Sequence, residues 1–100
     1  MDADTLELTF SGTLWQWRGP APYYFITVPA DAADALHAVA TAVTYGWGVI
    51  PADVRLGDSV WSTSLFPKDG GYLVPIKRAV RLGEQLSEGD IVEIHLLVRL

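Results

Sequence analysis

The sequence predicts a mainly β fold: a small, largely antiparallel barrel of about six strands, capped by two helices. Three observations predict it. Strand-like segments outnumber helical ones, and short turns join them where a parallel sheet would need long crossovers. The chain has 100 residues, of which 50% are hydrophobic, enough for one core and too few for two. We therefore expect a single domain spanning residues 1–100.

Alternation predicts the first two strands. Apolar and polar residues alternate from Thr5 to Trp15, the period of a strand with one buried face. Gly12 takes an inward position without a side chain, which predicts either a bulge or the close approach of another backbone. Aromatic and β-branched residues from Tyr23 to Val28 then predict a second strand, which Pro29 ends.

A helix and a hairpin follow. Asp31 is a candidate N-cap for a helix over 31–44, whose apolar face is Leu36, Val39, Ala40 and Val43. Pro51 is expected to delay the next strand, which we place at 52–56. Gly57-Asp58 is a two-residue hairpin signal, so the chain should return in a strand over 59–66.

The remaining elements are shorter. The segment 67–71 predicts a loop and 72–74 a short strand. Pro75 is well placed at the first position of a short helix that ends at Gly83. After a tight turn over 86–90, alternation over 92–100 predicts the closing strand.

Composition excludes several classes of function. The chain has no cysteine, so disulfides, thiolate catalysis and zinc–cysteine clusters are excluded, and we expect a cytoplasmic protein. Neither an export signal nor a membrane-spanning segment is recognisable. The formal net charge of -5 repels phosphate backbones and anionic lipids, so binding to nucleic acid is disfavoured.

Four cations nevertheless fall close together in the sequence: Lys68, Lys77, Arg78 and Arg81. With the amides of Gly70-Gly71 they are candidates for holding a phosphate or a carboxylate. The alternative is that cations in the last turn of a short helix complement the helix dipole and stay solvated. The sequence leaves both explanations open.

Large aromatic residues are numerous for so small a domain: Trp15, Trp17, Tyr23, Tyr24, Trp47 and Trp61. Several lie outside the predicted inward stripes, where they would line a groove or a partner surface. The alternative is core packing, because small barrels fill their interiors with aromatic rings, and Trp47 between two glycines would then plug one end. The exposed fraction of each aromatic side chain distinguishes a binding surface from core packing.

We expect no catalytic, metal or cofactor site. His37 and His95 are the two histidines, and Ser62, Ser64, Asp53 and Asp58 are the side chains that would complete a hydrolytic triad. No nucleophile elbow surrounds either serine. Asp31 and Asp34 lie near a helix start, where carboxylates usually cap.

A combination of short motifs resembles a known family. Its parts are an aromatic strand ending in Val28-Pro29, the segment Thr63-Ser64-Leu65, the pattern Gly71-Tyr72-x-x-Pro75-x-Lys77, and Gly89-Asp90 before the last strand. Together, in this order, they resemble the domain of unknown function nineteen-oh-five. The resemblance implies a double-split β-barrel, similar to AbrB-type transition regulators, with helical caps. It implies no established biochemical role.

These observations predict a non-catalytic module that binds a small anionic or aromatic ligand, or a protein partner. The predicted site consists of Trp47, Trp61, Lys68, Tyr72, Lys77 and Arg81. The alternative is an AbrB-like nucleic-acid-binding regulator, suggested by fold analogy alone. Because the chain carries enough strands to close a barrel by itself, we expect a monomer or a weak homodimer.

Overall fold

The computed structural model describes residues 4–20, 23–43 and 48–100. In chain order the elements are β1 (Thr5–Trp17), β2 (Tyr23–Thr27), α1 (Ala30–Val43), β3 (Ile50–Leu56), β4 (Ser59–Lys68), β5 (Gly71–Pro75), α2 (Arg78–Gly83) and β6 (Ile91–Arg99). Trp47 and the predicted helix end at Thr44 lie outside the described residues.

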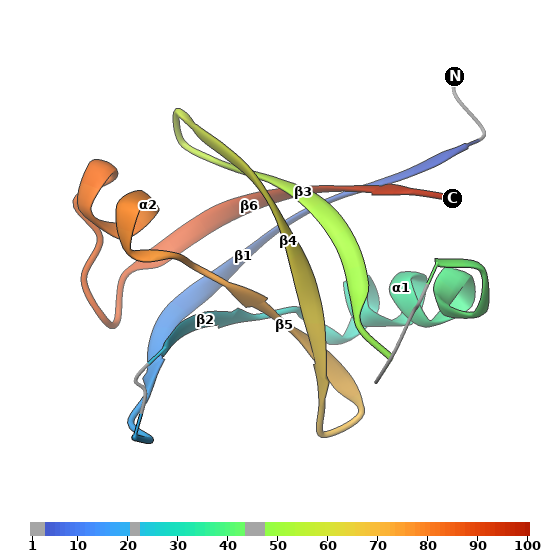
Figure 1. Ribbon diagram of the computed structural model, residues 1–100, viewed down its shortest axis with the longest axis horizontal. Coiled ribbons are helices and arrows are strands. Elements are labelled where there is room, and N and C mark those ends of the chain that lie inside the picture. Colours follow the sequence, from blue (N-terminus) through green and yellow to red (C-terminus); the bar gives the residue numbers. More distant parts are fainter. Residues whose placement is uncertain (1–3, 21–22, 44–47) are drawn as a thin grey trace.

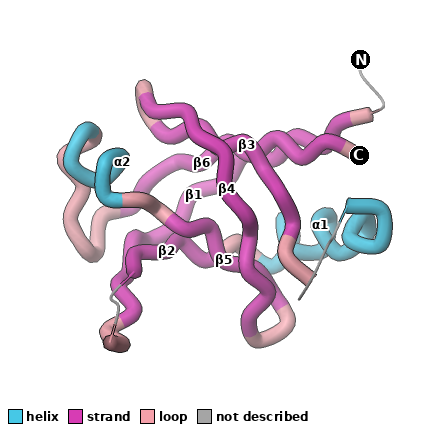
Figure 2. Tube along the Cα trace, in the orientation of Figure 1, coloured by secondary structure: helices cyan, strands magenta, loops and turns pink. Residues whose placement is uncertain are grey.

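The six strands form a closed barrel in the order β1-β2-β5-β4-β3-β6, and all neighbours are antiparallel. This confirms the fold class that the sequence predicts. Figure 1 shows the strands wrapping around one interior, with α2 and α1 on opposite sides of the barrel. Figure 2 shows that the barrel wall consists of strands, and that the two helices lie at its periphery.

Two strands change partner along their length. β1 pairs with β6 over Thr5–Thr13 and with β2 over Leu14–Trp17. β4 pairs with β3 over Ser59–Leu65 and with β5 over Phe66–Lys68. Each therefore belongs to both halves of the barrel wall, β1-β6-β3-β4 and β1-β2-β5-β4.

Gly12 lies where β1 passes from β6 to β2. A Cβ at this position would lie 2.6 Å from Cγ2 of Ile26, a distance that real Cβ atoms do not show. The pairing of β1 with β6 keeps one register throughout, without a bulge. A close approach therefore explains this glycine better than a bulge does, but the nearest atom belongs to the Ile26 side chain, and the predicted backbone neighbour, the carbonyl oxygen of Thr27, is at 3.4 Å.

The inward-facing residues match the predicted alternation. Leu14, Ile26, Ile50, Leu65, Val74 and Ile94 are completely buried. Along α1 the buried residues are Ala32, Ala33 and Leu36, while Val39 is half-buried. The predicted apolar face is therefore right at Leu36 but displaced toward the start of the helix, which packs against β3 and β5.

The predicted helix cap is wrong, because Asp31 is not the N-cap of α1. α1 begins at Ala30, so Asp31 lies in its first turn. The Asp31 carboxylate still accepts a hydrogen bond from the amide of Ala32 at 2.8 Å. A carboxylate in a first turn is favourable because it lies near the positive end of the helix dipole.

Pro51 does not delay β3, which already begins at Ile50. Pro51 is paired with Ser64 of β4, whereas the pairing of β3 with β6 covers only Asp53–Arg55. The proline therefore lies on a stretch of β3 with one neighbour, where a missing amide hydrogen is tolerated.

The predicted loop over 67–71 is a two-residue turn. β4 continues through Pro67 to Lys68, which pairs with Gly71. Asp69 and Gly70 have φ values of 51° and 81°. Positive φ at both central residues is typical of the type I′ turn that closes tight hairpins.

Pro75 does not begin α2. It ends β5 as the partner of Phe25, and the next amide, of Ile76, donates to the carbonyl of Tyr24 at 2.9 Å. Sheet pairing thus holds the backbone extended beyond the proline, and Lys77 becomes the N-cap of a helix over Arg78–Gly83.

Candidate functional site

Aromatic residues gather on the outside of the barrel, over β1, β2 and β4. We define the aromatic face as Trp15, Trp17, Tyr23, Phe25 and Phe66. Alternation puts them there: the fully buried Leu14 and Ile26 are directly paired and point inward, so the next pair, Trp15 and Phe25, points outward.

The rings of the aromatic face pack on one another. Phe25 is at their centre, with ring centroids of Trp15 at 5.4 Å, Tyr23 at 6.3 Å and Phe66 at 6.5 Å. Phe25 is only 5% exposed, although it does not belong to the interior cluster. The barrel therefore has a second apolar cluster on its outer wall.

The outer part of this cluster is open. Trp17 is 51% exposed, Tyr23 58% and Phe66 47%. These rings surround a hollow of about 660 Å³, which we call the aromatic hollow. Its lining is completed by Phe25, Thr63, Ser64, Pro67, Lys68, Leu73 and Pro75. The volume is in the range of small-molecule sites.

A second hollow, of about 420 Å³, adjoins the first. We call it the basic hollow, because Lys77, Arg78 and Arg81 line it. The two hollows share Tyr23, Thr63 and Pro75, so one continuous depression runs from the aromatic rings to the cations of α2.

The charged side chains among the described lining residues of this depression are all positive. With Lys68, four of the chain's seven Lys and Arg residues line one of the two hollows. Among the described lining residues there is no Asp or Glu, although the chain has 12. In a protein of net charge -5, this depression is a local region of positive potential.

Arg81 is held in place by stacking. Its Cζ lies 3.7 Å from the ring centroid of Tyr24, a cation–π contact. Its Nε is buried and makes no hydrogen bond within the described part of the chain. Arg81 also forms no ion pair with a described carboxylate, so its charge is not neutralised internally.

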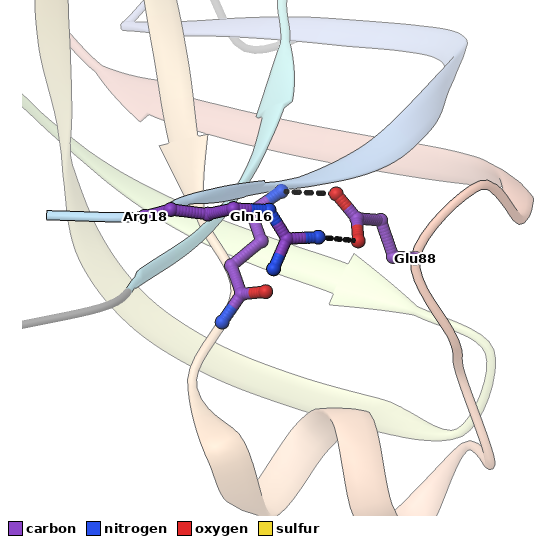
Figure 3. A network of polar contacts seen from close by, with 3 residues as sticks. All are labelled: Gln16, Arg18 and Glu88. Carbon is purple, nitrogen blue, oxygen red and sulfur yellow. Dashed lines mark hydrogen bonds and ion pairs between the residues drawn. The ribbon is translucent and has the colours of Figure 1, made fainter.

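The cations outside the depression include two that are neutralised. Figure 3 shows Glu88 between the backbone amide of Gln16, which donates at 3.3 Å, and the guanidinium of Arg18. Arg99 bonds Asp53 in the same way. Lys68 has a long, exposed contact of 3.8 Å with Asp69, which contributes little.

The helix-dipole explanation does not account for the whole basic cluster. Arg81 lies in the last turn of α2, where a cation is favourable. Lys77 and Arg78, however, are the N-cap and first residue, at the positive end of the dipole. The dipole therefore does not stabilise these two cations.

The structure brings four of the predicted site residues to this depression. Lys77, Arg81 and Trp61 line the basic hollow, although Trp61 is 7% exposed and packs in the core. Lys68 lines the aromatic hollow, with its Nζ 5.9 Å from the ring centroid of Trp17.

Tyr72 is not part of this arrangement. Tyr72 is buried in the core, with its ring centroid 5.1 Å from that of His37. His37 in turn contacts the carbonyl of Gly70 at 2.8 Å, so this pair joins α1 to the β4–β5 hairpin. Trp47 lies outside the described residues.

Sequence reasoning missed the floor of the aromatic hollow. Phe25, Phe66 and Leu73 were not predicted as site residues, and neither was Tyr24 as the stacking partner of Arg81. The signal was present in β1 and β2, where aromatic residues occupy the positions opposite the inward stripe. For Phe66 and Leu73 the sequence carries no such signal, because these two residues come together through the pairing of β4 with β5.

The wall formed by β1, β3 and β6 carries a network of polar side chains. There His95 contacts Thr9 Oγ1 through Nδ1 at 3.1 Å and Glu93 Oε1 through Nε2 at 2.9 Å. Nearby, hydrogen bonds from Ser62, at 2.6 Å, and from Arg99 hold the pKa of Asp53 below its ordinary value. These contacts complete a local surface network.

No group of three metal-ligating side chains gathers anywhere in the described ranges. Nor is any helix there long and apolar enough to cross a membrane.

Comparison with known families places the chain. A family model described as Domain of unknown function (DUF1905) matches residues 10–96. The chain belongs to the DUF1905 family. The matched DUF1905 region includes every described residue that lines the two hollows. No curated protein matches the chain.

Proposed function

We propose that this DUF1905 domain is a non-catalytic binding module whose site is the depression formed by the aromatic and basic hollows. Its ligand is a small molecule that joins a flat apolar body to an anionic group. The observation that carries this proposal is the direct junction, at Tyr23, Thr63 and Pro75, of an exposed aromatic hollow and a hollow whose cations form no ion pair with a described carboxylate.

The aromatic hollow supports the apolar part of the ligand. Trp17, Tyr23 and Phe66 are each about half exposed around one depression. A flat ring seated among them removes apolar surface from water on both partners, at about 25 cal/mol per Å². Aromatic pairs gain a further ~0.5–1.5 kcal/mol from favourable ring geometry.

The basic hollow supports the anionic part. Lys77 and Arg78 are exposed and form no ion pair with a described carboxylate, and Arg81 is fixed on Tyr24. Like charges close together repel one another, and a bound anion relieves that repulsion. Guanidinium groups suit carboxylate and phosphate oxygens because their donors form a fixed fork.

We also propose that the barrel is of the double-split type. That β1 and β4 each serve both halves of the wall supports a double-split barrel of the AbrB type. We do not propose an AbrB-like function in nucleic-acid binding. The cations are gathered in one depression, and the net charge of -5 repels a phosphate backbone. A barrel closed within one chain supports a monomer or a weak homodimer.

Calorimetric titration with naphthalenesulfonate, a flat ring carrying one anionic group, tests the proposal. The variant Lys77→Gln/Arg78→Gln removes two exposed cations from the basic hollow. Arg55→Gln removes an exposed cation from β3, outside both hollows. We expect saturable binding that weakens about tenfold in the first variant, the effect of losing ~1.4 kcal/mol of charge attraction, and is unchanged in the control. Equal affinity in all three proteins would contradict the proposed site.

A further inference from the structure

We infer that the anionic group is a phosphate monoester, so that the ligand is the monophosphate of a planar ring compound. The ring lies in the aromatic hollow and the phosphate in the basic hollow. This inference rests on the proposed function and adds the chemical class of the anion.

The number of cations favours a doubly charged group. Lys77, Arg78 and Arg81 line one hollow of about 420 Å³, and no described carboxylate accompanies them there. A single carboxylate or sulfonate would leave most of that positive charge uncompensated. A phosphate monoester carries close to two negative charges at neutral pH and presents three acceptor oxygens. It is therefore the better match in both charge and number of acceptors.

The two kinds of lining also match the two ends of such a molecule. Tyr23 belongs to both hollows, so a ring against Tyr23 has its substituent directed at the cations without a long linker. The Cζ of Arg81 lies 3.7 Å from the ring centroid of Tyr24, and this contact restrains one donor fork in advance. Thr63, also shared, adds a hydroxyl at the junction.

The test uses one ring with three different charges: naphthyl phosphate, naphthalenesulfonate and neutral naphthol. We expect naphthyl phosphate to bind about tenfold more tightly than the sulfonate near pH 8. Near pH 5 the ester has lost most of its second charge, because its second pKa is about 6, and the two affinities should become similar.

The comparison of the two ligands separates the ionisation of the ligand from that of the protein. The ionisable side chains that line the basic hollow are Lys77, Arg78, Arg81, Tyr23 and Tyr24, and Asp53 lies next to it, where it accepts a hydrogen bond from the lining residue Ser62 at 2.6 Å. At each pH both ligands meet these same groups, and the two ligands differ only in the ionisation of their own anionic group. A change in the affinity ratio between pH 5 and pH 8 therefore reports the ionisation of the ligand.

The outcomes separate this inference from the proposed function. If the sulfonate binds in the hollows but the phosphate binds no more tightly, at any pH, the phosphate assignment is wrong and the proposed function stands. If neither anion binds more tightly than naphthol, both are wrong. If a single-stranded thymidine oligonucleotide binds more tightly than naphthyl phosphate, with affinity falling steeply in salt, the depression binds a nucleic acid strand and the inference is overturned.

Matched variants locate the effect. Lys77→Gln/Arg78→Gln should remove the preference for phosphate over sulfonate, and both residues are exposed, so the fold is retained. Arg55→Gln changes an exposed charge outside the depression and should keep the full preference. A preference that survives in the double variant would place the phosphate elsewhere and overturn the assignment.

Discussion

Replacing Gly12 by alanine tests the contact that lets β1 change partner and carry Trp15 and Trp17 to the outer wall. The added Cβ would lie 2.6 Å from Cγ2 of Ile26, whose side chain is fully buried and cannot retreat into solvent. Overpacking of this kind costs about 1–3 kcal/mol. Restricting the unfolded chain gives back about 0.4–1 kcal/mol, so we expect a net loss of about 1–2 kcal/mol.

The partner substitution makes this prediction specific. Ile26→Ala removes the atom that the new Cβ meets and costs about 2–5 kcal/mol by itself. In that background Gly12→Ala should cost nothing, giving a coupling free energy of about 1–2 kcal/mol between the two sites. Gly83→Ala is the control, because a Cβ there meets nothing within 4 Å.

Urea unfolding, followed by circular dichroism, measures each free energy of unfolding from the midpoint and slope of the transition. Equal costs of Gly12→Ala in the wild-type and Ile26→Ala backgrounds would refute the steric explanation. An equal loss in the free energy of unfolding for Gly83→Ala and Gly12→Ala would show that replacing any glycine has this cost, whatever its surroundings.

Three further predictions concern the core, the hollow and acid stability. Leu65→Ala, at a completely buried position, should lower the free energy of unfolding by about 2–5 kcal/mol, whereas Val60→Ala, 70% exposed, should change it by less than about 0.5 kcal/mol in urea titrations. Phe66→Ala removes a half-exposed ring from the aromatic hollow, so calorimetry should show several-fold weaker binding of naphthalenesulfonate, while an unchanged affinity would remove Phe66 from the site. Because the pKa of Asp53 is lowered in the folded state from 3.8, its stabilising contribution is complete above that pH and is lost as the pH falls through the folded pKa. Asp53→Asn should therefore flatten the loss of stability below about pH 4 in acid-unfolding curves, and an identical curve would argue against this role.

Local patterns predicted much of the fold. The alternation that includes Leu14 identified β1 and its buried face, and the Gly57-Asp58 pair identified a hairpin. The predictions were wrong at positions where pairing with a strand distant in the sequence overrides the local preference of the residue. Pro75 favours a helix start, but its place opposite Phe25 keeps it in β5. Pro51 likewise lies in β3 because only one side of the strand is paired there.

The candidate site was predictable to a similar degree. Lys77 and Arg81 could be predicted as neighbours from their spacing, and both line the basic hollow. The floor of the aromatic hollow could not, because Phe25 and Phe66 meet only once the barrel closes through β5. Tyr72 shows the converse: its aromatic character suggested a ligand contact, but strand alternation turns it into the core.

A titration of the assigned two-dimensional amide NMR spectrum with naphthalenesulfonate tests most directly whether the depression is a binding site. We expect saturable shifts that are largest at Tyr23, Phe25, Thr63 and the Trp17 indole, all of which line the aromatic hollow. The polar network on β1, β3 and β6, reported by Glu93, should not respond. Shifts concentrated on that network, or shifts that never saturate, would contradict the assignment of the site.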